Sequence, residues 1–251
     1  MHLAVRLMLI FIVLLQGCRQ NTNQNPQDYF GGQQLVLAQA IESGKFEEVN
    51  KLAPKTELNK PGQHDMTLLF WAVGCSINDR NSVSKLKIIT DLVKSGADPL
   101  QQTQKGDSSP AEFVLKSDNG EWIKAMLDGG LSTDAKDKTF NKPIIFNTLE
   151  AKNTRTLKVM IDRGANINVT DSLGDTLLMY AMDYGKYEHV LLLLDSGADP
   201  TIPGKGGWTL GNQLERLLTD TKEDDEHYQI LNKIKEKLIK HGGKWPPVPV
   251  K

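Results

Sequence analysis

Five histidines and two cysteines are the side chains of this 251-residue sequence that could best bind a metal or act as nucleophiles. Beyond the first residues, the histidines stand far apart, at positions 64, 189, 227 and 241. None has the H-E-x-x-H spacing that places two ligands on one face of a helix. Cys75 is a lone thiol in an apolar stretch, which is typical of a core residue. The sequence therefore predicts a protein that is not an enzyme, with no metal site, no cofactor and no small-molecule substrate.

Three other segments could bind a ligand but have simpler interpretations. His189 lies near the start of a predicted helix, where we expect it to face solvent. Residues 204–207, Gly-Lys-Gly-Gly, lack the G-x-x-x-x-G-K-[ST] pattern of a phosphate loop and favour a hairpin turn. Residues 223–226 are consecutive acids without the alternating ligands and the glycine of a calcium loop, so they predict a solvated face.

An apolar stretch near the N-terminus, residues 7–15, follows the basic residues His2 and Arg6. As a helix it would rise about 14 Å, well short of the ~30 Å hydrocarbon core of a bilayer. Residues 1–17 therefore predict an export signal rather than a transmembrane span. Residues 15–18, Leu-Gln-Gly-Cys, resemble a bacterial lipobox, with Gln where alanine or serine is usual.

The lipobox resemblance implies cleavage before Cys18 and acylation of Cys18, which gives a membrane anchor. Two or more acyl chains hold a protein stably at a membrane, whereas one chain binds only marginally. Arg19 stands where lipoproteins of the inner membrane usually carry aspartate, so we expect the outer membrane, facing the periplasm. The alternative is an export signal without lipidation, which would leave Cys18 free to form a disulfide with Cys75.

The composition indicates a folded chain on a tether. The 30 basic and 31 acidic residues nearly balance, which disfavours a nucleic-acid partner. The hydrophobic share of 39% is too high for general disorder. Residues 18–34, in contrast, are rich in asparagine and glutamine and contain Pro26 and two adjacent glycines, so they predict a flexible tether.

Two landmarks repeat with one period along the rest of the chain. Apolar helical ends are followed by Gly96, Gly130, Gly164 and Gly197, spaced 34, 34 and 33 residues apart. The second landmark comprises Thr67, Ser109, Lys142, Thr176 and Thr209, spaced 42, 33, 34 and 33 residues apart. A period of this length predicts stacked helical repeats. Thr176 is expected to cap a first helix, and Gly197 to end a second helix in a left-handed conformation.

Residues 171–181, D-S-L-G-D-T-L-L-M-Y-A, are the clearest copy and resemble the ankyrin repeat, D-x-x-G-x-T-P-L-H-x-A. The resemblance implies an all-α solenoid of helix pairs with hairpin fingers over residues 35–243. We count about five repeats. A helical segment at residues 35–52 precedes them and is expected to form a capping half-repeat. Residues 244–251, which contain Trp-Pro-Pro, predict an extended tail that is packed on the last repeat or free.

Ankyrin-like stacks bind proteins on the concave face formed by their hairpins and first helices. The positions expected to point there are Trp208, Tyr184, Asp183, Asp175, Asn141, Lys138, Met66 and Ser108. Trp208 is interpreted either as an interface anchor or as a residue packed against the C-terminal repeat. Lys105, Lys136 and Lys205, with Lys138, form a predicted basic fringe that would steer an acidic partner.

The architecture resembles that of ankyrin-type lipoproteins that serve as immunity partners of antibacterial phospholipase effectors of type VI secretion. It implies a protein that binds and inhibits a secreted lipase or phospholipase toxin. No motif identifies the toxin. The alternative is an assembly or stress factor that holds a resident protein of the periplasm or envelope.

Overall fold

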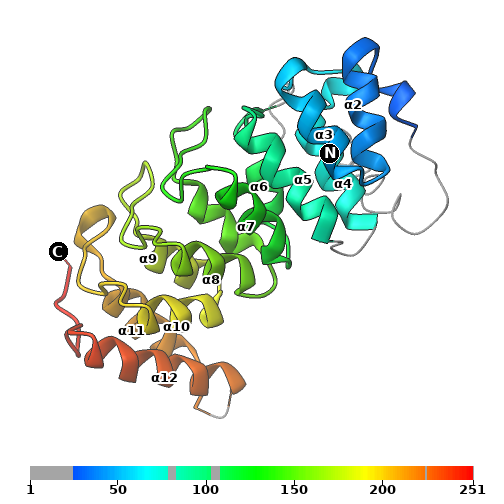
Figure 1. Cartoon of the computed structure of the whole chain (residues 1–251). Helices are drawn as coiled ribbons and strands as arrows, with labels where there is room; N and C mark the ends of the chain where they lie inside the picture. The colour runs from blue at the N-terminus through cyan, green and yellow to red at the C-terminus, as the bar shows by residue number, and fades with distance from the viewer. Residues whose placement is uncertain (1–24, 79–82, 103–107, 224, 251) are drawn as a thin grey trace, which may run out of the picture. The chain divides into compact units, whose positions relative to one another are not determined.

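The computed structural model describes residues 25–78, 83–102, 108–223 and 225–250 (Figure 1). The predicted export signal, Cys18 and Lys105 lie outside these ranges. Packing divides the chain into two compact units, residues 1–107 and residues 108–251, and each unit is described by itself. In the described residues all regular structure is helical, apart from two isolated β-bridges. The prediction of an all-α repeat fold is confirmed.

The described residues of unit 1 form two helix pairs. Its elements are η1 (Pro26–Asp28), α2 (Gly32–Glu42), α3 (Phe46–Leu52), η2 (Ala53–Lys55), η3 (Gln63–Asp65), α4 (Leu68–Asn78) and α5 (Val83–Lys94). The expected half-repeat at residues 35–52 is wrong, because two helices occupy this segment. Gly44, with φ of +64°, makes the turn between these two helices. This glycine was the sign in the sequence that one helix ends there and another begins. Helix α2 contacts α4, and α3 contacts α5, so the first pair stacks on the second.

The folded region begins before the expected end of the tether at residue 34. Phe30 is only 5% exposed, and its ring meets Trp71 edge to face at 6.1 Å. The Gln34 amide donates hydrogen bonds to the carbonyls of Glu57 and Lys60. Burial of one aromatic ring repays the ordering of a short polar segment, so residues 25–34 extend the first repeat.

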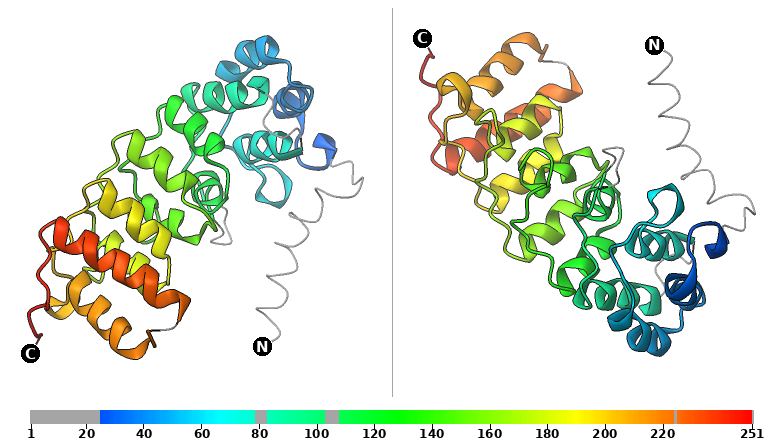
Figure 2. Two further views of the ribbon diagram at one scale, coloured as in Figure 1. Left: turned by 90° about the horizontal axis from the view of Figure 1, so that it is seen from below. Right: turned by 90° about the horizontal axis from the view of Figure 1, so that it is seen from above.

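In the part of unit 2 that the structure describes, the helices form four pairs (Figures 1 and 2). Its elements are α6 (Pro110–Leu115), α7 (Gly120–Asp128), η4 (Ile144–Glu150), α8 (Arg155–Asp162), α9 (Leu177–Asp183), α10 (Tyr187–Asp195), η5 (Lys205–Gly207), α11 (Leu210–Asp220) and α12 (Glu226–Lys240). Neighbouring pairs pack through α7 against α8, α9 against α11 and α10 against α12. Between the second and third pairs, the rings of Phe146 and Tyr180 meet edge to face at 5.3 Å.

The repeated landmarks act as helix boundaries. The Thr176 hydroxyl accepts a hydrogen bond from the Met179 N–H at 3.1 Å, and Gly197 has φ of +87°, as predicted. Ser109 forms a reciprocal capping box with Glu112. Lys142 has no oxygen acceptor for this role and precedes Pro143, and here the first helix of the pair is the 3₁₀ segment η4.

His189 is buried rather than solvent-facing, with 2% of its surface exposed. Its Nε2 has no hydrogen-bond partner, and burial lowers the pKa of its imidazole. The expectation of a solvent-facing residue is therefore wrong. The backbone groups of Thr148 in η4 and of Asn153 in the turn after it lie beside the His189 imidazole.

Candidate protein-binding surface

Three hairpins in unit 2, here called the fingers, precede the first helices of the last three pairs (Figure 1). They span residues 136–143, 170–176 and 204–208. A backbone hydrogen bond closes each finger, from Asp137 to Lys142 at 2.9 Å, from Asp171 to Asp175 at 3.0 Å, and from Gly204 to Trp208 at 2.7 Å. The Gly-Lys-Gly-Gly segment is thus the predicted turn.

Aspartates order the tips of the first two fingers. The Asp137 carboxylate, 8% exposed, accepts hydrogen bonds from the backbone N–H groups of Thr139, Phe140 and Lys142. Asp171 accepts in the same way from the N–H groups of Leu173 and Asp175. Each carboxylate satisfies turn donors that the backbone leaves unpaired, so the tips are preorganised.

The ordered tips display apolar side chains to solvent. Phe140 is 77% exposed on the first finger, and Leu173 is 61% exposed on the second. Tyr184, at the end of α9, is 62% exposed. Exposed apolar residues on adjacent repeats are typical of an interaction site.

The first helices carry what we call the aromatic row: Lys142, Phe146, Tyr180 and Tyr184. The rings of Phe146 and Tyr180 meet edge to face at 5.3 Å, and Tyr180 stacks on Tyr184 at 4.6 Å. The Lys142 ammonium lies over both of the first two rings, 4.7 Å from the Phe146 centroid and 4.2 Å from that of Tyr180. Such cation–π contacts fix an otherwise flexible side chain.

The next repeat continues this surface through Arg216. Its guanidinium lies 4.0 Å from the Asp183 carboxylate and 5.7 Å from the centre of the Trp208 ring. Partial burial raises the pKa of Asp183, and the neighbouring Arg216 charge opposes that rise. Trp208 is half-buried, so one part of its ring packs on the repeat and another part faces solvent.

The structure brings only some of the predicted binding residues together. Asp183 and Trp208 both contact Arg216, and Tyr184 stacks on Tyr180. Asn141 and Lys138 lie exposed on the first finger. The Asp175 carboxylate accepts from the Lys205 N–H at 3.2 Å and so links two fingers. Ser108 directly precedes the capping residue of α6, and Met66 lies in unit 1.

Sequence reasoning missed Lys142, Tyr180, Arg216 and Phe140 as surface residues. One sign was available, since Tyr180 and Tyr184 are four residues apart and share a helix face. Phe140 stands where the clearest copy of the repeat has Gly174, and no further sign of its exposure was available. The position of Arg216 beside Trp208 depends on the packing of α11 against α9, which no local pattern gives.

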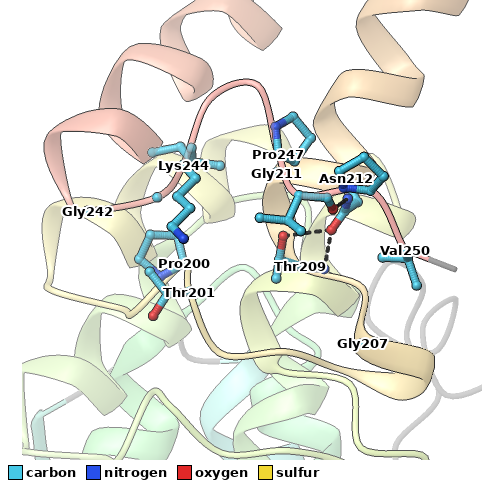
Figure 3. Close-up of a pocket in the computed structure, with 14 residues that line it drawn as sticks. Pro200, Thr201, Gly207, Thr209, Gly211, Asn212, Gly242, Lys244, Pro247 and Val250 are labelled. Carbon is cyan, nitrogen blue, oxygen red and sulfur yellow. Dashed lines mark hydrogen bonds between the residues drawn. The ribbon is translucent and has the colours of Figure 1, made fainter.

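The C-terminal tail packs on the last repeat, which resolves the two predicted alternatives for it (Figure 3). The Asn212 amide donates a hydrogen bond to the Val248 carbonyl at 2.8 Å. Gly211 leaves room for Pro247, because a Cβ at Gly211 would lie 3.2 Å from the proline ring. A pocket of about 520 Å³ lies beneath the tail. A second, shallower pocket is lined by the tail together with Trp208 and Arg216.

The described residues offer little reactive chemistry. Burial raises the pKa of the Cys75 thiol to about 12, so the thiol stays protonated at neutral pH. No three side chains among His, Cys, Asp and Glu in the described ranges gather as metal ligands. None of the described helices combines the length and apolar character needed to cross a bilayer.

Comparison with known proteins identifies the repeats. Residues 111–203 match the family model described as ankyrin repeats, three copies. Residues 111–203 are ankyrin repeats. Protein PhlB of Serratia liquefaciens is 25% identical over 182 residues, which cover 71% of this chain and 76% of PhlB.

Solved structures show the same fold. The ankyrin repeat domain of Bcl-3, of the IkappaB protein family, superposes with a TM-score of 0.61 at 20% identity, covering 83% of this chain and 86% of that domain. A chain from the Bdellovibrio bacteriovorus complex of the predatory endopeptidase Bd0816 with immunity protein Bd3460 gives a TM-score of 0.50 at 19% identity, covering 79% and 97%. Ankyrin repeats indicate protein–protein interaction, and the fold is typically a non-catalytic scaffold.

Proposed function

We propose that this protein binds a protein partner through the fingers and the aromatic row of unit 2. The observation that carries the proposal is the exposure of Phe140, Leu173 and Tyr184 on ordered elements of adjacent repeats. Rigid, exposed aromatic and apolar side chains lose little conformational entropy on binding, so they serve as anchors. Trp208 and Arg216 extend the same surface and belong to the residue types that are enriched at binding hot spots.

We further propose that the partner is an antibacterial toxin, a phospholipase or lipase effector of type VI secretion, and that this protein is its immunity protein. Two observations support this. Residues 15–18 resemble a lipobox, which would hold the protein at the outer membrane where incoming toxins act. The Bdellovibrio complex with a similar fold has an immunity protein as one of its components. Inhibition would follow from covering the toxin's catalytic cleft or its membrane-docking surface.

Affinity capture of the tagged lipoprotein from envelope extracts tests the choice of partner. Extracts of strains with type VI secretion intact and disabled are compared by mass spectrometry. One secreted hydrolase bound near one to one supports immunity. A resident envelope protein, with a growth defect when the lipoprotein is deleted, indicates an assembly or stress factor instead.

A double variant then tests the surface in a protection assay against the captured toxin. Tyr184→Ala with Trp208→Ala should weaken protection while circular dichroism and thermal melting stay unchanged. Ile239→Ala is the matched control, because it removes an exposed apolar side chain of α12 outside the fingers and the aromatic row. Full protection by the double variant, or equal loss in the control, would refute this assignment of the surface.

A further inference from the structure

Within the aromatic row, the rings of Phe146 and Tyr180 hold the Lys142 ammonium in place. Tyr184 covers one face of the Tyr180 ring, so the Lys142 ammonium, 4.2 Å from that ring's centroid, lies over the other face. Within the described part of the chain, no carboxylate forms an ion pair with this ammonium. By contrast, Lys158 on α8 pairs with Asp162 at 2.9 Å.

The aspartates of the first two fingers accept hydrogen bonds from backbone N–H groups. Asp137 is buried and accepts three N–H bonds, and Asp171 accepts two. Asp175 accepts from the N–H of Lys205. Lys136 is exposed on the first finger, so this finger presents a second cation to solvent beside Phe140.

Apolar side chains border this positive region. Phe140 and Leu173 project from the tips of the first two fingers, and Tyr184 lies on the other side of the Tyr180 ring. The surface thus combines a fixed ammonium, the exposed Lys136 and exposed apolar groups. A positively charged partner would be repelled by this surface. A partner that presents a carboxylate with apolar neighbours would complement both its charge and its apolar side chains.

We propose that Lys142 and its surroundings recognise an acidic segment of the protein partner, with one carboxylate placed against the Lys142 ammonium. Apolar side chains of that segment pack on Phe140 and Leu173. The two rings hold the ammonium in position before binding, so the pairing costs little side-chain entropy. The surrounding contacts exclude water, which strengthens the charge-assisted hydrogen bond. The inference rests on the proposed protein binding, and it does not require that the partner be a toxin.

Selection from a random peptide library tests this partner chemistry directly. The full chain, the variant Lys142→Met and the control Lys158→Met serve as baits. Methionine keeps an unbranched apolar stem and a favourable sulfur contact with the rings, so the aromatic row should stay packed. Peptides selected on the unaltered protein and on the control should be enriched in aspartate and glutamate. Peptides selected on Lys142→Met should lose that enrichment.

Affinity measurements on the strongest acidic peptide complete the test. Lys142→Met should bind it at least about tenfold more weakly, as should the unaltered protein when each acid of the peptide is replaced by its amide. Combining the two changes should add little further loss, because both remove one interaction. Acid enrichment that persists on Lys142→Met, or no acid enrichment on the unaltered protein, would overturn the proposal.

The two proposals fail separately. The peptide selection uses purified protein and no toxin, so a failed protection assay leaves its outcome intact. Conversely, a toxin that binds without any acidic preference would preserve the proposed function and remove the role assigned to Lys142.

Discussion

Replacement of Asp137 by alanine should loosen the first finger, because one buried carboxylate holds three turn donors. Its Oδ1 accepts from the N–H of Thr139 at 3.0 Å and from the N–H of Phe140, and its Oδ2 accepts from the N–H of Lys142 at 3.0 Å. A hydrogen bond to a charged acceptor contributes about 1.5–3 kcal/mol when buried. In the variant, water at the fingertip can accept some of the hydrogen bonds that the carboxylate accepted. We therefore expect a loss of about 2–3 kcal/mol in the free energy of unfolding.

Asp137→Asn should be intermediate. The amide oxygen can still accept from Thr139 and Phe140, but the NH₂ group would face the N–H of Lys142, donor against donor. The expected loss is about 1–2 kcal/mol. Asp162→Ala is the control, because its carboxylate is 56% exposed and pairs only with Lys158, so it should change the free energy by less than about 0.5 kcal/mol.

Urea unfolding followed by circular dichroism measures these free energies, and limited trypsin digestion reports on the finger itself. Cleavage after Lys138 should be much faster in Asp137→Ala than in the unaltered protein, because trypsin needs an opened backbone. The reasoning would be refuted if Asp137→Ala unfolded like Asp162→Ala and its finger resisted trypsin as before. The order of the tip would then arise from its other hydrogen bonds.

Four further predictions concern two helical glycines and the buried side chains of His189 and Cys75. Gly120→Ala should lower the free energy of unfolding by about 1–3 kcal/mol, since the new Cβ would lie 2.8 Å from a side-chain carbon of α8. Gly74→Ala, in a helix with no atom within 4 Å of the new Cβ, should be neutral or stabilising in the same urea titration. Because burial lowers the pKa of His189 below its ordinary 6.5, the unfolded chain takes up a proton at higher pH than the folded one. The free energy of unfolding should therefore fall below about pH 6.5, by at most about 1.4 kcal/mol per pH unit, and urea titrations of His189→Gln should show a flatter pH profile. The Cys75 thiol, with a pKa of about 12, should resist a thiol reagent at pH 8 until denaturant is added, in a chain whose Cys18 is blocked; rapid labelling of the native protein would contradict its burial.

Part of the surface could be predicted because its signs are local. The alignment of Tyr184, Asp183 and Trp208 with ankyrin binding positions predicted one surface for them. In the structure Arg216 contacts both Asp183 and Trp208. Asp137 and Asp171 occupy equivalent positions of the repeat, 34 residues apart, and both order a fingertip. Their role could also have been read from the Asp-x-x turn pattern.

The burial of other side chains depended on tertiary packing. His189 has the polarity of a surface residue, and only the elements around the start of α10 make it buried. Phe30 lies in a segment whose composition predicts a tether, yet contact with Trp71 draws it into the first repeat. Trp208 could not be assigned from sequence, because its half-burial depends on where α11 and the C-terminal tail lie.

The sequence by itself determined the repeat fold, since helix caps and left-handed glycines act within a few residues and recur with one period. Thr176 and Gly197 did in the structure what their types and positions predicted. Only the tertiary structure decided which charges lack a partner and which rings lie together. Lys142 sits between Phe146 and Tyr180, from two different repeats, because stacking brings residues more than thirty positions apart into contact. Contacts of that range are set by the packing of whole helices, and no local pattern encodes them.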